Sequence, residues 1–95
     1  MIERWPTSTE LTEAVPNALS RLGGSANVSE LDQTVIKDIE LSQTLLEIKR
    51  SGNRGEIQYR LAWIRTKAKQ NGLVTKEANR NWKLTEKGKA LANNL

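Results

Sequence analysis

The residues best suited to chemistry in this sequence are the cations, amides and hydroxyls gathered on residues 56–71. If this segment is a helix with about 100° per residue, its apolar side chains fall on one stripe that faces the core, and the opposite side is free for contacts. The predicted core stripe is Ile57, Leu61, Ile64 and Ala68. Arg and Lys can pair with phosphate or guanine, Gln with adenine, and Thr with a base edge, so the free side suits a DNA groove. The predicted DNA contacts in and just before this segment are Arg54, Gln58, Tyr59, Arg60, Trp63, Thr66, Lys67, Lys69 and Gln70.

Trp63 projects away from the core stripe and has two interpretations. In the first, which we favour, it leans sideways and covers the junction with the short helix before it, because single tryptophans are more often packing residues than ligand contacts. In the second, its flat apolar surface meets a base, or the methyl group of thymine or of a modified base.

A second basic stretch follows, in which two short β-like runs, 73–75 and 82–84, flank the polar connection 76–81. This pattern predicts a hairpin with a mobile tip. Lys76, Arg80 and Lys83 would touch the phosphate backbone if this hairpin lies on DNA, and would otherwise be ordinary solvated charges; the neighbouring basic helix favours DNA contact. Trp82 alternates with Lys83 and is expected to pack under the hairpin.

The composition excludes most catalytic chemistry. The sequence has no Cys and no His, which removes disulfides, thiol nucleophiles, histidine bases and nearly all zinc sites. Magnesium held by carboxylates would need acidic residues gathered at strand ends, whereas the acidic residues here lie on predicted helices. We therefore expect no catalytic residues, no metal and no cofactor in this chain.

The charges are unevenly distributed along the chain. Residues 1–47 carry three basic and eight acidic residues, a net charge of −5, whereas residues 48–95 carry twelve basic and three acidic residues, a net charge of +9. A polyanion-binding face in the second half explains this asymmetry, because Lys and Arg that neutralise phosphates release condensed counterions. A solvated surface that keeps the protein soluble explains it equally well.

Three shorter helices are predicted before the basic segment. The first spans roughly residues 12–22, with Pro16 tolerable only near its first turn. Ser29 is expected to cap the second, and Ser42 a short third helix that fades at residues 50–52. Residues 51–55, with two glycines, are expected to be the most flexible internal stretch.

The end of the chain completes a recognisable order of elements. Gly72 is placed to close the basic helix as a left-handed C-cap, and Thr85 to cap a last helix that starts at Glu86. Helices followed by a hairpin and a return helix predict a mainly α structure with a small β-hairpin, an α+β winged helix-turn-helix, as one domain over residues 1–95. In that fold helix 56–71 enters the major groove, and the wing, residues 73–84, reaches a neighbouring groove or phosphates.

Three segments of the sequence resemble the N-terminal domain of Mrr-type restriction endonucleases: YRLAWIR at 59–65, QNGLV at 70–74 and WKLTEKG at 82–88. The resemblance implies a winged helix that delivers a separate nuclease domain to DNA, often modified DNA. Two departures stand out: Ala68 occupies a position where that family usually has a larger apolar residue, and the sequence has no paired acidic and lysine motif of a nuclease. The resemblance therefore implies recognition rather than cleavage by this chain.

Together these observations predict a DNA-binding specificity module of a restriction or DNA-processing enzyme. The expected partners are double-stranded DNA, methylated or unmodified, and a nuclease or other effector domain in the full-length protein. With no apolar span and no secretory signal, we expect a cytoplasmic location, no membrane contact and a monomer in isolation. A stand-alone transcriptional regulator, which would normally dimerise, and a winged helix that binds only protein remain alternatives.

Overall fold

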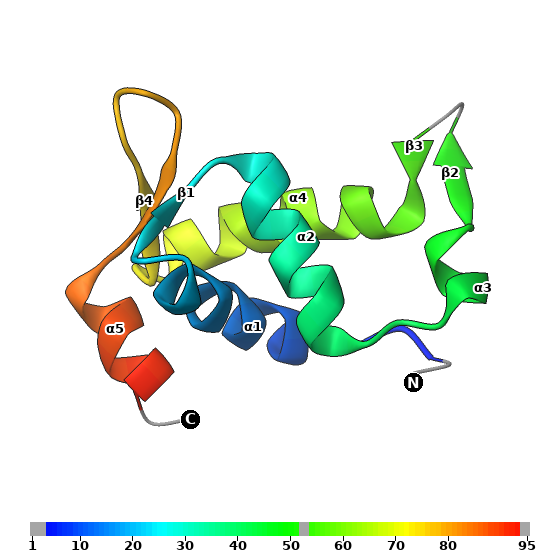
Figure 1. Ribbon diagram of the computed structural model, residues 1–95, viewed down its shortest axis with the longest axis horizontal. Coiled ribbons are helices and arrows are strands. Elements are labelled where there is room, and N and C mark those ends of the chain that lie inside the picture. The colour runs from blue at the N-terminus through cyan, green and yellow to red at the C-terminus, as the bar shows by residue number, and fades with distance from the viewer. Residues whose placement is uncertain (1–3, 52–53, 94–95) are drawn as a thin grey trace.

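A computed structural model describes residues 4–51 and 54–93 of the chain (Figure 1). Within these residues five helices combine with two small antiparallel sheets. In chain order the elements are α1 (Ser8–Arg21), β1 (Ser25–Ala26), α2 (Val28–Ile39), α3 (Gln43–Leu46), β2 (Lys49–Ser51), β3 (Arg54–Gly55), α4 (Glu56–Gln70), β4 (Val74–Lys76), β5 (Trp82–Leu84) and α5 (Glu86–Asn93).

Helix α1 begins four residues before the predicted start at Thr12. Thr7 and Glu10 form a capping box that satisfies backbone N–H groups of the first turn and starts the helix at Ser8. Pro16 consequently lies in the helix interior, so its predicted place near the first turn is wrong. Pro16 has no N–H to donate to the Thr12 carbonyl one turn earlier, and the helix nevertheless continues to Arg21.

The predicted N-cap of α2 is wrong, and the predicted N-cap of α3 is confirmed. Asn27, and not Ser29, is the N-cap of α2, because its side-chain oxygen accepts a hydrogen bond of 2.8 Å from the Glu30 N–H. Ser42 caps α3 as predicted and accepts from the Leu45 N–H at 3.2 Å. Helix α3 ends at Leu46, before the predicted fading point, because the chain turns into β2.

The predicted hairpin is present, and it belongs to a larger sheet. Strands β4 and β5 pair antiparallel, and β1 pairs with the other edge of β5, which gives the order β1-β5-β4. Strand β1 was not predicted, because two residues are too few to show the alternation of a strand. Trp82 and Leu84 face inward and Lys83 outward, as expected.

The connection between α2 and α4, residues 40–55, is much longer than the three- or four-residue turn of a simple helix-turn-helix. It contains α3 and the antiparallel pair β2–β3, which lies against the N-terminal end of α4 (Figure 1). This strand pair was not predicted. Residues 51–55 were expected to be the most flexible internal stretch: residues 52 and 53 lie outside the described part of the chain, and residues 51, 54 and 55 belong to β2 and β3.

One hydrophobic core joins the helices to the three-stranded sheet. Helix α1 packs against α2, α4 and α5, and α4 contributes its predicted stripe. The fully or nearly fully buried core side chains include Leu11, Val15, Leu19, Leu31, Val35, Ile57, Leu61, Ile64, Ala68, Val74, Trp82 and Leu84. The arrangement is a winged-helix-like α+β fold, and the predicted fold class is confirmed.

Two glycines hold the wing sheet against the helices. Gly72 follows the C-cap of α4 with a φ of +78°, a left-handed conformation that glycine adopts without strain, as predicted. Gly88 lies in α5 where a Cβ would collide with the Leu73 carbonyl oxygen. The Thr85 hydroxyl caps α5 as expected, accepting from the Gly88 N–H at 3.0 Å.

No helix among the described residues is long and apolar enough to cross a membrane.

Candidate nucleic-acid interface

Helix α4 presents one buried face and one exposed face, and it lies between two hairpins. Hairpin β2–β3 contacts it near its N-terminus and strand β4 leads away from its C-terminus (Figure 1). The helix ends at Gln70 with Asn71 as its C-cap, one residue before the predicted end. The predicted core stripe is fully confirmed, because Ile57, Leu61, Ile64 and Ala68 are its buried residues.

Most of the predicted contact residues on α4 are exposed and lie opposite this stripe. Tyr59 and Arg60 are half-buried, and Arg54 lies in β3 with a side chain outside the described part of the structure. The exposed residues are Gln58, Trp63, Thr66, Lys67, Lys69 and Gln70. Helix α4 therefore offers a polar and basic surface about four turns long, with one large apolar side chain at its centre.

Trp63 is that apolar side chain, and it is 62% exposed. The favoured interpretation of the sequence, in which Trp63 is a packing residue, is therefore wrong. Ile57, Leu61 and Ile64 already fill the core side of α4, so nothing in the core requires the indole ring. A tryptophan this exposed is suited to contact a ligand or partner.

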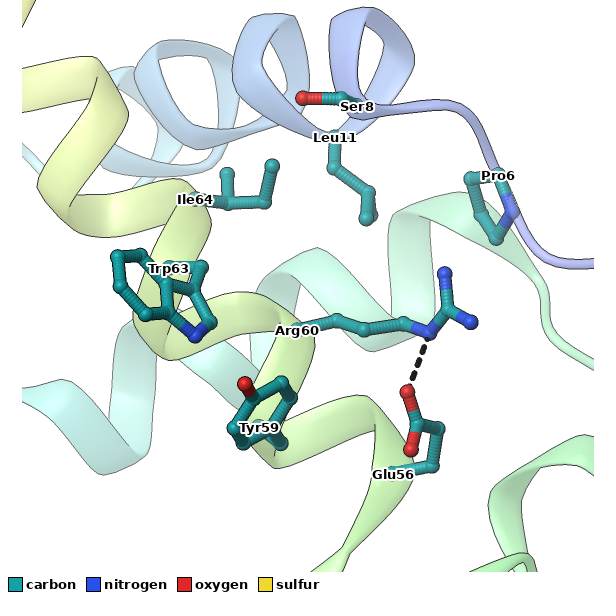
Figure 2. A pocket seen from close by; sticks show the side chains of 8 residues that line it. All are labelled: Pro6, Ser8, Leu11, Glu56, Tyr59, Arg60, Trp63 and Ile64. Carbon is teal, nitrogen blue, oxygen red and sulfur yellow. Dashed lines mark hydrogen bonds and ion pairs between the residues drawn. The ribbon is translucent and has the colours of Figure 1, made fainter. Parts of the chain in front are cut away.

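Arg60 is engaged within the protein. Its Nε donates to Glu56 Oε2 at 2.8 Å, and its guanidinium lies 4.5 Å from the centroid of the Trp5 ring. Figure 2 shows the Arg60 side chain extended from α4 toward Pro6. The ion pair holds the Arg60 side chain in place on α4, and the cation–π stack joins it to the chain before α1.

Two other residues of α4 that were predicted to contact DNA form hydrogen bonds within the protein. Lys67 Nζ donates to Ser8 Oγ at 3.0 Å, and Thr66 Oγ1 donates to the Ala62 carbonyl at 3.2 Å. Both side chains are exposed, so exchanging these bonds for bonds to DNA would cost little. Lys67 and Lys69 lie in the last turn of α4, where positive charge also favours the helix dipole.

The wing carries its three predicted contact residues on exposed positions. Lys76 Nζ lies 4.9 Å from the centroid of the Trp82 ring, and Lys83 points outward from β5. Arg80 lies in the turn with a φ of +71°, a left-handed conformation unusual for a residue with a side chain. Glu77 accepts from the Ser25 hydroxyl at 2.6 Å and so ties the base of the wing to β1.

A cavity of about 290 Å³ lies beside Trp63, between α4 and the start of α1 (Figure 2). Its lining residues are Pro6, Ser8, Leu11, Glu56, Tyr59, Arg60, Trp63 and Ile64. A shallower hollow of about 250 Å³ lies on the outer face of α4, between Trp63 and its neighbours Tyr59, Ala62 and Thr66. A third hollow, of about 310 Å³, is lined by Trp63 together with Ser8, Ile64, Thr66, Lys67, Gln70 and Asn71, so the indole stands among three hollows.

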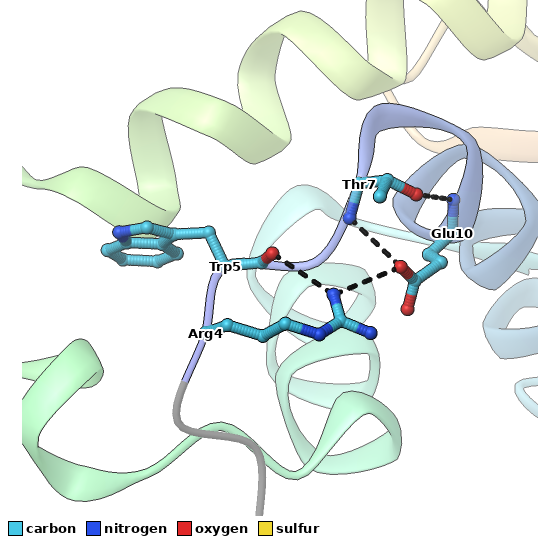
Figure 3. A network of polar contacts seen from close by, with 4 residues as sticks. All are labelled: Arg4, Trp5, Thr7 and Glu10. Atoms are coloured by element: carbon cyan, nitrogen blue, oxygen red, sulfur yellow. Dashed lines mark hydrogen bonds and ion pairs between the residues drawn. The ribbon is translucent and has the colours of Figure 1, made fainter.

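The sequence did not lead us to expect that the segment before α1 forms one wall of the cavity. Arg4 Nη1 reaches both the Trp5 carbonyl oxygen, at 3.4 Å, and Glu10 Oε1, at 3.3 Å (Figure 3). Bonds to the Thr7 backbone N–H and to Arg4 hold the pKa of Glu10 below its ordinary value. The sequence nevertheless contained a signal for the start of α1, because Thr7 is followed three residues later by Glu10, which is the pattern of a capping box.

A buried ion pair holds α2 against α4. Arg65 Nη1 lies 2.6 Å from both Asp32 oxygens, and both side chains are only about one-seventh exposed, at 13% and 14%. Burial raises the pKa of Asp32, and the hydrogen bonds from Arg65 oppose that rise. Arg65 is thereby assigned to structure rather than to contact.

Comparison with known families agrees with this architecture. The family model of the Mrr N-terminal domain matches residues 9–94, which include nearly every described element. The chain belongs to the Mrr N-terminal domain family. The resemblance found in the three sequence segments is therefore confirmed, and this Mrr N-terminal domain is associated with restriction enzymes. No curated protein and no solved structure gives a significant match to the chain.

Proposed function

We propose that this Mrr N-terminal domain binds double-stranded DNA as the specificity module of a restriction or other DNA-processing enzyme. The observation that carries the proposal is the division of α4 into a fully buried apolar face and an exposed polar and basic face. An exposed helix of this kind fits the major groove, and the adjacent wing fits a neighbouring groove or phosphates.

The exposed residues divide by the contacts that their chemistry allows. Gln58, Thr66 and Gln70 can read base edges, since an amide pairs with adenine and a hydroxyl with several bases. The cations position the domain on the phosphates and carry little sequence information. These cations are Lys67, Lys69, Lys76, Arg80 and Lys83, together with Arg54 of β3.

Arg60 and Trp63 have different roles in this proposal from those expected of their residue types. Arg60 is a positioning residue, because Glu56 and Trp5 already hold its guanidinium. Trp63, at the centre of the exposed face, contacts a base or a base methyl group, and so responds to methylation of the target.

Cleavage in this proposal belongs to a nuclease or other effector domain of the full-length protein. Residues 1–95 act as one recognition domain, and the effector acts where that domain is bound. The family assignment supports this division, because it is the N-terminal domain of restriction enzymes that the chain matches.

Fluorescence anisotropy with labelled duplexes tests the proposal. Three matched oligonucleotides, unmodified or carrying methyladenine or methylcytosine, are titrated from about 50 to about 200 mM salt. We expect affinity to fall steeply with salt, and Lys69→Ala to reduce the slope of log K against log salt by about one. Lys37→Ala, an exposed lysine on α2, is the matched control and should leave the slope unchanged.

The result that would overturn the proposal is the absence of duplex binding at low salt for all three oligonucleotides. The net charge of −5 on residues 1–47 favours one other function, a winged helix that binds a basic protein surface. That function would be preferred if Lys69→Ala changed neither DNA binding nor its salt slope.

A further inference from the structure

The cavity between α4 and the start of α1 is lined by apolar side chains and by the planar groups of Trp63 and Arg60 (Figure 2). Its floor is apolar, formed by Leu11 and Ile64, both at most 5% exposed. The Trp63 indole stands on one side, and Arg60, held by Glu56 and stacked on Trp5, on the other. The polar lining residues are Ser8, Glu56, Tyr59 and Arg60.

These walls differ in how firmly they are held. Arg60 has an ion pair at 2.8 Å and a stacking partner at 4.5 Å, so its guanidinium plane is already in place. Trp63 is largely exposed and can turn about its side-chain bonds without disturbing the core. A ligand entering between them would meet a fixed wall and an adjustable one.

A nucleobase matches this chemistry. It is flat, stacks well on indole and guanidinium planes, and carries hydrogen-bonding groups only at its edges. A cavity of about 290 Å³ has room for one base. The Ser8 hydroxyl at the rim can bond to a base edge, and the Lys67 ammonium bonded to it can approach the neighbouring phosphate.

The position of the cavity connects it with the proposed DNA surface. Trp63 belongs both to the exposed face of α4 and to the cavity wall, so a base leaving a duplex bound on α4 would pass along its ring. Extruding a base costs unstacking and unpairing energy, which is smallest where the base is mismatched. Stacking in the cavity would offset part of that cost.

We propose that this cavity binds a single nucleobase that has left the double-helical stack, with Trp63 and Arg60 as its flat walls. The inference rests on the proposed function, since α4 must first be bound to DNA. It makes the domain a sensor of weakly paired or unpaired bases as well as a reader of the groove.

The experiment compares three DNAs by fluorescence anisotropy: a fully paired duplex, the same duplex with one central mismatched pair, and the corresponding single strand. We expect the wild-type protein to bind the mismatched duplex about ten times more tightly than the paired one. Trp63→Ala removes one wall, and Ser8→Phe fills the cavity from α1. Both variants should reduce the preference for the mismatched duplex to about one.

Val28→Ala is the matched control, because Val28 is an exposed apolar residue at the start of α2. It should keep the full preference, and thermal unfolding of each variant shows that it is folded. If the wild-type protein binds both duplexes equally, or if the preference survives in both cavity variants, the cavity does not hold a base, while the proposed function stands. If no duplex is bound, the proposed function fails, and the single strand decides: binding lost in Ser8→Phe supports the site, and binding absent or unaffected overturns it.

Discussion

Arg60 and Trp63 lie three residues apart on α4, and their side chains are used in opposite ways. Arg60 was expected to reach DNA, yet its guanidinium is enclosed by Glu56 and Trp5. Trp63 was expected to pack, yet most of its surface is exposed. Residue type alone predicted the opposite role for each side chain. The observed roles arise because the N-terminal segment supplies an aromatic partner for Arg60 and leaves Trp63 uncovered.

Replacing Arg60 should therefore affect stability more than DNA affinity. We expect Arg60→Ala to lower the free energy of unfolding by about 1 kcal/mol, through loss of the stack on Trp5 and of a partly exposed ion pair. Urea denaturation measures this change, and anisotropy measures duplex affinity. A Trp5→Ala variant should be destabilised more, because Trp5 also packs against the core, and the double variant should lose less than the sum of the two single losses. Additive losses would show that the two side chains do not act together.

At the scale of elements, α4 packs chiefly against α1, and a buried ion pair joins it to α2. The pair between Asp32 and Arg65 joins α2 and α4 at a site where both side chains are mostly buried. Such a pair is costly to break from one side, because the remaining charge has neither water nor a partner. The pair links α4, which carries the proposed contact face, to α2, while the main packing partner of α4 is α1.

We expect Asp32→Ala to destabilise the protein by roughly 3 kcal/mol, since Arg65 would keep a poorly solvated charge. The double replacement Asp32→Leu with Arg65→Met removes both charges and should recover most of that loss. Thermal and urea unfolding of the three proteins measures the effect. A double variant as unstable as Asp32→Ala would mean that the pair contributes through geometry that an apolar contact does not replace.

The pair between Asp32 and Arg65 also makes the free energy of unfolding depend on pH, and the burial of Asp32 determines the sign of this dependence. Because burial raises the pKa of Asp32, the folded state binds this proton more tightly than the unfolded state does. The contribution of Asp32 to stability is therefore most favourable below its unfolded pKa, near 4, and declines as the pH rises through the folded pKa. Asp32→Asn lacks the titration, so wild-type stability should fall relative to this variant as the pH rises from about 3 to about 7. A relative rise would mean that Arg65 outweighs burial.

At the scale of the whole molecule, folding separates the basic residues into those paired within the fold and those left exposed. Part of the basic surplus is neutralised within the fold, as Arg65 pairs with Asp32 and Arg60 with Glu56. What remains on exposed positions lies mainly along α4, the wing and α5. The proposed DNA surface thus uses the cations that folding leaves accessible.

The isolated chain is expected to be monomeric. Among the described residues 4–51 and 54–93, the exposed large apolar side chains are Val28 on α2, Ile48 just before β2 and Trp63 on α4. Separate apolar residues of this kind do not form the large contiguous patch that a stable dimer needs. Light scattering should give the mass of one chain, and a stable dimer would favour the stand-alone regulator instead.

Several features of the fold could be predicted from the sequence because they are local or periodic. The stripe of Ile57, Leu61, Ile64 and Ala68, the left-handed Gly72 and the Thr85 cap each depend on residues within one or two turns. Trp82 alternates with Lys83 in the same local way. The early start of α1 also depends on neighbouring residues, Thr7 and Glu10, but it was not predicted.

The remaining features depend on which segments meet in space. Strand β1 is defined only by its pairing with β5, Asp32 meets Arg65 across 33 positions of sequence, and Trp5 reaches Arg60 from before the first helix. Periodicity shows which side of a helix is buried, but it does not show which distant side chain covers the flanks of that side. The sequence alone therefore determined the buried face of α4. Only tertiary packing decided that Arg60 and Arg65 are held inside the fold and that Trp63 stands beside an open cavity.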